Sequence, residues 1–319
     1  MCIAIISTAH PKYRLILLDN RDEFLNRPTS TASFWPSFPD VFGSRDLLRS
    51  TQGTWLGATR SGKVAVLTNY KEDYVDPKAT SRGAIIKKFL TEDVGSTDEF
   101  VKNIVNTGVA KDAGGFSLVC GQLGEQLAVI SNRAKAGGEV PWIAGDIVQT
   151  VGLSNAAFTD RTWKKVLMGE EMTVEAIRKS VAKKETEDQL IKRLLTILSH
   201  DTLPRDGDLA EGGLDTYITE LRNTIFVPPL GRKSKASLDG DKLRSANDQE
   251  KVKVVDGQSK FDIKQLGVDG IYATQKQSVV LVDHDMNVRF FERTLWDHNS
   301  EKVELGKGDV DVTFKLVPT

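Results

Sequence analysis

Cysteine is scarce in this chain of 319 residues, which contains only Cys2 and Cys120. Two cysteines argue against a disulfide framework and a multi-cysteine metal site, and a reducing compartment is the simpler expectation. Charge of one sign is not in excess either, because 43 basic residues stand against 44 acidic residues. We therefore expect no nucleic-acid partner and no attachment to a membrane surface through bulk electrostatics.

Long apolar runs are missing as well. No stretch approaches the ~18 residues of a membrane span, and the first residues lack the charged and long apolar regions of a secretory signal. The sequence therefore predicts no transmembrane segment and a cytoplasmic location. With 39% hydrophobic residues, the chain can bury a large core as one large domain or two small ones.

The most informative residue is Cys2, which directly follows the initiator methionine. Removal of that methionine leaves a thiol and a free α-amine on one residue. The amine titrates near pH ~8 and can act as a general base for the thiol. This is the chemistry of an N-terminal nucleophile that attacks a carbonyl carbon. The alternative is a small, buried apolar residue without a chemical role.

A predicted hairpin carries polar residues back to this cysteine. Two apolar runs that begin at Cys2 and Tyr13 are typical of adjacent antiparallel strands. The turn between them places Cys2 opposite Asp19 or Asn20, give or take two positions of register. The polar residues 20–23 then crowd the same strand end, where they can hold a polar nucleophile, although such a group is also typical of a solvated turn.

Periodicity and turn residues predict the remaining elements. Residues 26–50 are predicted to form a long loop in which the aromatic side chains pack against one another. The polar segments 201–213 and 229–260 are predicted to be mobile insertions. Further strands are expected at 53–59, 63–68, 116–121, 126–131, 147–151, 270–274, 278–283 and 288–293, and helices at 84–90, 97–107, 161–167, 173–182 and 186–198. Strands, then helices, then strands again indicate a layered α+β fold.

Two asparagines, Asn69 and Asn155, each follow an apolar strand. Side-chain amides at strand ends can be aimed at a developing oxyanion, where one donor contributes about 3 kcal/mol. Asparagine after a strand is also common turn chemistry. The pattern alone therefore leaves both readings open.

Several short motifs occur in order over nearly the whole chain. They are Met1-Cys2-Ile3, Asn20-Arg21-Asp22-Glu23-Phe24 with Arg27-Pro28, Gly53-Thr54-Trp55-Leu56-Gly57, Leu67-Thr68-Asn69-Tyr70, Ser81-Arg82-Gly83, Gly152-Leu153-Ser154-Asn155 and Glu292-Arg293-Thr294. Together they resemble the transport and Golgi organisation protein 2 family, also called the NRDE family. The resemblance implies one domain over 1–319 with the fold of N-terminal nucleophile hydrolases, a four-layer αββα sandwich.

The resemblance also implies a site. By similarity to cysteine amidases of that fold, Cys2 would be nucleophile and base in one residue, and Asp22 would orient its α-amine. Asn69 and Asn155 would lie near the oxyanion or the substrate, and Arg21 would be a cation near the thiolate. The residues expected to bind substrate are Asn20, Glu23, Trp55 and Tyr70.

One motif departs from the family pattern. Where the family usually has Tyr-Gly-Thr-Arg, this chain has Tyr272-Ala273-Thr274-Gln275. A cation expected near the site is missing unless Lys276 or Arg293 substitutes for it. Loss of this cation would affect hydrolytic activity, and it would also change the charge that the site favours in a ligand.

The function therefore has several readings. The first is an amidase or acyl-thioesterase that acts on a lipid-like substrate through an acyl-enzyme at Cys2. The second is a non-catalytic binder or carrier of acyl-coenzyme A or haem, and the third is an interaction protein in which the thiol is dispensable. The resemblance links the chain to Golgi organisation, secretion and lipid homeostasis, and to a Golgi or mitochondrial association. We expect no cofactor and no metal site, because the histidines lie in predicted turns or near segment ends: His10, His200, His284 and His298.

Overall fold

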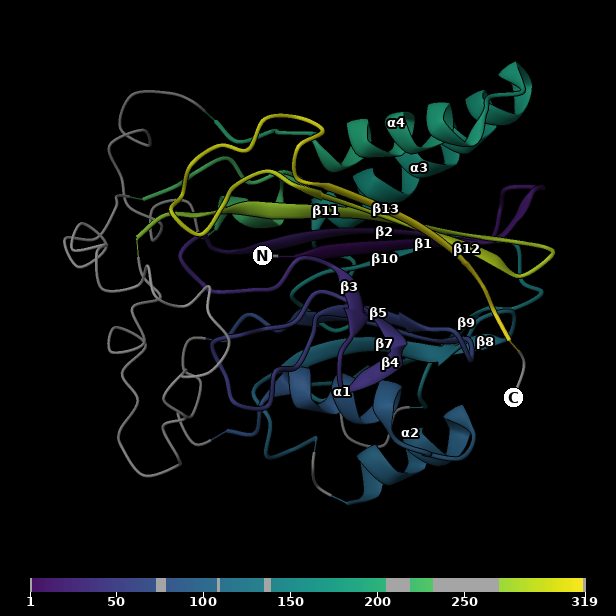
Figure 1. The fold of residues 1–319 in the computed structure, drawn as a ribbon, viewed down its shortest axis with the longest axis vertical. Coiled ribbons are helices and arrows are strands. Elements are labelled where there is room, and N and C mark those ends of the chain that lie inside the picture. Colours follow the sequence, from purple (N-terminus) through teal and green to yellow (C-terminus); the bar gives the residue numbers. More distant parts are fainter. Residues whose placement is uncertain are drawn as a thin grey trace.

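The computed structural model describes residues 2–72, 79–107, 110–134, 139–204, 219–231 and 270–317. Two antiparallel sheets lie face to face, and a pair of helices covers the outer face of each sheet (Figure 1). This arrangement is the four-layer αββα sandwich of the α+β class, as predicted. Most of the two segments read as insertions, 201–213 and 229–260, lies outside the described residues.

The first sheet contains the N-terminal hairpin and the C-terminal strands. Its order is β10-β1-β2-β11-β12-β13. The bounds are β1 Ile3–Ser7, β2 Tyr13–Phe24, β10 Thr150–Leu153, β11 Tyr272–Asp283, β12 Asn287–Thr294 and β13 Asp309–Lys315. Helices α3 (Lys164–Lys183) and α4 (Glu187–Leu198) cover its outer face, and a short 3₁₀ turn, Glu220–Arg222, follows them in the chain (Figure 1).

The second sheet is built in chain order, β3-β4-β5-β6-β7-β8-β9. The bounds are β3 Ser33–Trp35, β4 Phe38–Gly43, β5 Leu56–Thr59, β6 Lys63–Asn69, β7 Phe116–Gln122, β8 Gln126–Ser131 and β9 Trp142–Ala144. Helices α1 (Arg82–Thr91) and α2 (Thr97–Asn106) cover its outer face (Figure 1). Because α2 begins with a capping box between Ser96 and Glu99, its start is fixed locally.

Side-chain alternation divides the core into layers. Ala4 and Ile6 of β1 pack between the two sheets, whereas Ile3 and Ile5 pack against α3 and α4. The same alternation runs along β2, so consecutive residues at its end face different layers. This division decides which of the polar residues 20–23 can meet a ligand between the sheets.

The register of the first hairpin agrees with the prediction to within the two positions allowed. Ile3 pairs with Asn20 and Ala4 pairs with Asp19, two positions from the central prediction. The turn closes by a hydrogen bond from Tyr13 N to His10 O (3.1 Å) and is centred one residue later than expected. The shift carries the residues after Asn20 to the thiol end of β1.

The long loop predicted at 26–50 is wrong, because this segment contains β3 and β4. Aromatic packing between the sheets stabilises the two short strands: the rings of Phe34 and Phe42 lie 5.0 Å apart. Trp35 Nε1 also donates to Gly43 O (2.9 Å). Pro36 in the turn and Pro39 within β4 interrupt the alternating pattern that would have predicted this short hairpin.

The helices predicted at 161–167 and 173–182 form one helix, α3, and the strands predicted at 270–274 and 278–283 form one strand, β11. Helix α3 runs through Gly169, where a Cβ atom would lie 2.6 Å from Cδ1 of Ile5, so the glycine allows close helix-to-strand packing instead of ending the helix. Strand β11 runs from Tyr272 to Asp283 with an irregularity at Gln275 in its pairing with β2. That irregularity leaves Gln275 as an extra residue beside the site.

Candidate functional site

Cys2 lies where three strand ends meet. It directly precedes β1 and is 3% exposed. Its Sγ contacts Asp22 O at 3.7 Å, and its own carbonyl accepts a hydrogen bond from Ser154 Oγ (2.6 Å). Burial raises the pKa of the thiol to about 12, with the Asp22 charge adding to the shift. The thiol is therefore neutral at physiological pH unless a base takes its proton.

A chain of hydrogen bonds joins Cys2 to the second sheet. Ser154, which binds the Cys2 carbonyl, also contacts Asn155 Oδ1 (3.1 Å). The Asn155 amide donates to the backbone carbonyl of Asn69, at the end of β6. The structure thus brings both predicted asparagines to the edge of the sandwich where the thiol lies.

Asp22 is held from the neighbouring strand. Its Oδ1 accepts a hydrogen bond from Thr274 Oγ1 (2.6 Å), and its backbone carbonyl accepts one from the Tyr272 hydroxyl (3.1 Å). These two contacts come from the motif at which the chain departs from the family pattern. The positions before Gln275 therefore still support the carboxylate.

Lys165 is a buried cation that the sequence argument missed. It has no exposed surface, and it comes from the first turn of α3. Burial lowers the pKa of the amine to about 8, while the opposite charge of Asp22 partly offsets this effect. Its helical spacing to Gly169 and Thr173, both on the buried face of α3, is the signal that could have revealed it.

Arg21 points into the space between the sheets. Its Nη2 donates to Thr29 Oγ1 (3.0 Å) and to Gln275 Oε1, and its guanidinium lies 4.9 Å over the Trp55 ring. Its Nε and Nη1 have no hydrogen-bond partner among the described residues. Burial lowers the pKa of Arg21, whereas the nearby Glu292 charge opposes that shift. Gln275 thus presents an acceptor to Arg21 where a second arginine would present a like charge.

The proposed substitutes for the missing family arginine are held in ion pairs. Lys276 Nζ lies 2.6 Å from Glu292 Oε1, and both side chains are buried. Arg293 Nη2 lies 2.7 Å from Asp309 Oδ2, on β13. Lys165 is instead the lysine that interacts electrostatically with Asp22.

The structure separates the four residues predicted to bind substrate. Asn20 faces the helices, because its Nδ2 donates to Leu198 O (2.7 Å) and to Ile225 O (3.0 Å). Glu23 and Trp55 line a pocket. Tyr70 is not among the residues that line it. Its backbone N–H bonds to Gly115 O (2.7 Å), which fixes the exit of β6.

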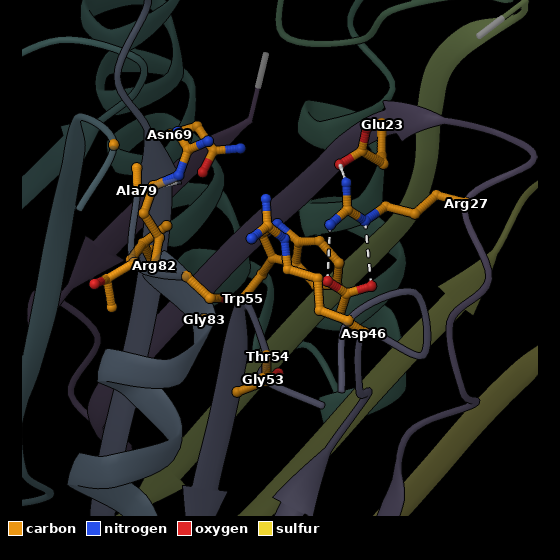
Figure 2. A pocket seen from close by; sticks show the side chains of 15 residues that line it. Glu23, Arg27, Asp46, Gly53, Thr54, Trp55, Asn69, Ala79, Arg82 and Gly83 are labelled. Atoms are coloured by element: carbon orange, nitrogen blue, oxygen red, sulfur yellow. Dashed lines mark hydrogen bonds and ion pairs between the residues drawn. The ribbon is translucent and has the colours of Figure 1, made fainter. Parts of the chain in front are cut away.

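The pocket opens where the ends of β2 and β6 face the start of α1 (Figure 2). It encloses about 590 Å³ of space, part of which is open solvent. Arg27 lies between Glu23 and Asp46, with ion-pair distances of 3.4 and 2.7 Å (Figure 2). Its guanidinium also lies 5.4 Å from the Trp55 ring, so the indole lies close to both Arg27 and Arg21. The lining residues are Glu23, Arg27, Asp46, Arg49, Gly53, Thr54, Trp55, Leu67, Asn69, Ala79, Thr80, Ser81, Arg82, Gly83 and Gly114.

Comparison with protein families identifies the chain. Residues 1–297 match the family described as Transport and Golgi organisation 2. The chain belongs to this family. A Bos taurus relative named Transport and Golgi organization protein 2 homolog is 30% identical over 285 residues, which cover 89% of this chain and 87% of that protein. The Mus musculus homolog is 29% identical over 297 residues, 92% of this chain and 90% of its own.

Two solved structures show limited similarity. The Caenorhabditis elegans N-acylethanolamine-hydrolyzing acid amidase ortholog aligns with a TM-score of 0.43 at 14% identity, covering 65% of this chain and 89% of that one. A C2A mutant of conjugated bile acid hydrolase from Clostridium perfringens aligns with a TM-score of 0.36 at 12% identity, covering 100% and 98%. Likenesses at this level of identity concern the course of the chain and not the reaction.

The histidines do not form a ligand set in the described part of the chain. Within those ranges, no group of three or more His, Cys, Asp or Glu residues could hold a metal ion. His10 is buried, contrary to the surface role expected for it, and its ring packs 4.8 Å from the Tyr13 ring. It lies beyond the opposite end of β1 from Cys2.

No helix in the described ranges combines the length and apolar character needed to cross a membrane.

Proposed function

We propose that the chain is an N-terminal cysteine hydrolase that cleaves the amide or thioester bond of a lipid-like acyl substrate. The observation that supports this most directly is the junction at Cys2. Asp22 lies on one side of it, and hydrogen bonds run through Ser154 and Asn155 to Asn69 on the other. A buried cysteine with only a packing role does not need this set of polar neighbours.

The first chemical step requires removal of Met1, which lies outside the described residues. The freed α-amine of Cys2 then takes the proton from Sγ as Sγ attacks the acyl carbon. Asp22, held by Thr274, orients the resulting ammonium. Because the pKa of the thiol is raised to about 12, the reaction depends on this base.

The second step uses the asparagines. The Asn69 side chain and the second N–H of the Asn155 amide stabilise the oxyanion of the tetrahedral intermediate. The carbon–nitrogen or carbon–sulfur bond then breaks, and the leaving group receives the proton from the ammonium. Water attacks the Cys2 thioester, gives a proton to the amine, and releases the free acid with the thiol restored.

The family supplies the physiological setting of the proposal. We assign the activity to lipid homeostasis linked to Golgi organisation and secretion, in a cytoplasmic protein associated with the Golgi or with mitochondria. Hydrolysis of an acyl bond fits that setting because it releases a fatty acid or a similar acid from its carrier.

A non-catalytic carrier of acyl-coenzyme A or haem is the second candidate. The burial and the raised pKa of Cys2 favour it, since a neutral thiol is a poor nucleophile. Acyl-coenzyme A suits the pocket better than haem does, because arginines line its wall whereas no histidine does.

Labelling of the thiol separates the two candidates. Intact mass spectrometry of the purified chain, before and after reaction with an acyl-mimicking thiol probe, should show loss of Met1 and one fast adduct. Cys2→Ala should abolish the adduct. Cys120→Ala is the matched control, because Cys120 is fully buried with a raised pKa, and it should label like the wild type. Retained Met1, or labelling no faster than that of a free cysteine, would favour the carrier.

A further inference from the structure

We propose that the pocket in Figure 2 contains an anion subsite in which Arg49, Arg82 and the first turn of α1 bind an oxyanion of the ligand. The oxyanion is a carboxylate or a phosphate. The inference deepens the proposed function, and its assignment to a substrate rests on that function. The subsite itself stands on charge, backbone geometry and position.

The ion pairs of the pocket leave two of its three arginines without a carboxylate partner. Among the described residues, three arginines and two carboxylates line the wall. Both carboxylates, Glu23 and Asp46, form ion pairs with Arg27. The Arg49 side chain makes no hydrogen bond or ion pair within the described part of the chain, and Arg82 Nη1 donates only to the neutral Gly115 carbonyl (3.1 Å).

The neighbouring acid does not neutralise the pair. Glu72 accepts hydrogen bonds from Arg133 Nε (2.7 Å) and from Gly115 N, so its charge is already compensated. The pKa values of Arg49 and Arg82 are lowered, mainly by burial and next by the charge of a neighbouring arginine. Arg49 remains accessible to solvent and Arg82 is half-buried, and two like charges held together favour binding of an anion between them.

Helix α1 adds backbone donors to the same wall. Ser81, its N-cap, makes no side-chain capping bond, and its first turn contains no acidic residue. Ser81 lines the pocket together with Arg82 and Gly83, which are labelled in Figure 2. The positive end of the helix therefore faces the cavity without an acidic side chain of its own to satisfy it.

Two glycines build this wall by allowing backbones to touch. A Cβ atom at Gly53 would lie 2.4 Å from the backbone carbon of Gly83, and one at Gly83 would lie 3.2 Å from Thr54 N. The connection between β4 and β5 can therefore press against the first turn of α1. This contact brings the segment that carries Arg49 to Arg82.

The position of the subsite defines a substrate class. Asn69, which the proposed mechanism uses for the oxyanion of the intermediate, lines the same pocket (Figure 2). A ligand held by Arg49 and Arg82 would therefore direct its other end towards Asn69, which hydrogen bonds through Asn155 and Ser154 connect to Cys2. The substrate is an acyl compound that carries an anionic group apart from the bond that is cleaved.

Anion binding to the full chain with Cys2→Ala tests this inference without turnover. Thermal unfolding is followed in titrations with inorganic phosphate and, separately, with acetate, at ionic strength held constant with chloride. At least one anion should raise the unfolding temperature, and the more effective anion identifies the oxyanion. Arg49→Gln and Arg82→Gln, each added to this background, should weaken its binding at least about tenfold.

The control is Arg178→Gln, an exposed arginine of α3 that pairs with Glu175 outside the pocket. It should leave the affinity within about twofold. The inference is overturned if neither anion stabilises the chain, or if the Arg49 and Arg82 variants bind like the control. Anion binding together with failed Cys2 labelling would refute the hydrolase and keep the subsite, whereas the reverse result would refute only the subsite.

Discussion

At the scale of single residues, Lys165 is the buried cation on the helix side of Asp22. A lysine without exposed surface is uncommon unless opposite charges accompany it. Here burial disfavours the ammonium, and the charge of Asp22 opposes that effect only in part. The amine consequently titrates close to neutral pH, at about 8, beside the residue whose proton the mechanism must move.

This environment makes a prediction for stability against pH. The pKa of Lys165 is about 8 in the folded chain and 10.5 in its ordinary state. Between these values the unfolded chain holds a proton that the folded chain has lost, so unfolding becomes harder as pH rises. The free energy of unfolding of the wild type, relative to Lys165→Met, should rise by up to about 3 kcal/mol across this window.

Urea unfolding at several pH values from 7.5 upwards measures this difference. Subtracting the variant removes the contributions of Cys2 and of the tyrosines, which titrate in the same region. Lys179→Met is the control on α3, because Lys179 is exposed, and its difference from the wild type should stay flat. A flat difference for Lys165→Met too would mean that this amine does not titrate near 8.

The residues of the site differ in how far sequence could reveal them. Cys2 and Asp22 were identifiable because one hairpin brings them together, and the asparagines because they follow strands. Lys165 was not, since its partners lie on another layer and only the helical phase marks it as buried. The arginine excess of the pocket was also hidden, because it depends on which carboxylates already pair with Arg27.

At the scale of elements, the contact between α3 and β1 sets the distance between the helix layer and the first sheet. Gly169 faces Ile5 so closely that an added Cβ would meet its Cδ1 at 2.6 Å. The obstructing atom is the end of a side chain and not backbone. A shorter side chain at position 5 can therefore relieve the contact.

We expect Gly169→Ala to destabilise the chain by about 1–2 kcal/mol, because overpacking outweighs the gain in helix propensity. Ile5→Val removes the obstructing Cδ1. Alone it should cost about 1 kcal/mol, yet in the Gly169→Ala background it should restore stability. Chemical denaturation of the four chains measures the coupling. Additive changes would show that the helix moves away from the strand instead.

The elements that sequence predicted and those it missed differ in burial. The strands of the first hairpin are nearly all buried and rich in β-branched residues, so their pattern is strong. Strand β13 at the sheet edge was not predicted, although its charged residues alternate with valine at the period of a strand; only one of its residues is buried. Strand β9 has only three residues, too few for periodicity.

At the scale of the whole molecule, a buried polar cluster joins the two sheets. Glu292 of β12 pairs with Lys276 of β11 and accepts hydrogen bonds from Ser44 Oγ at 2.9 and 2.8 Å, at the end of β4 in the other sheet. All three side chains are buried. The cluster therefore fixes how the first sheet lies on the second sheet at the end of β4.

Glu292→Gln should destabilise the chain by about 3–5 kcal/mol, because it leaves the buried Lys276 without its counter-charge. The exposed carboxylate Glu175 offers the comparison, and Glu175→Gln should leave the unfolding midpoint unchanged in the same urea titration. Equal effects of the two substitutions would show that the buried pair does not hold the sheets together.

The alternation of side chains along the end of β2 has a consequence for how the family can diverge. Asn20 bonds to α4, and Asp22 interacts with Lys165 of α3. Arg21 instead lies against Trp55, and Glu23 lines the pocket. Substitutions in α3 and α4 can therefore change the electrostatic environment of Asp22 without changing the wall of the pocket. Mutations around Trp55 can change the preferred ligand while Asp22 is untouched. One four-residue segment thereby allows selectivity and reactivity to evolve independently.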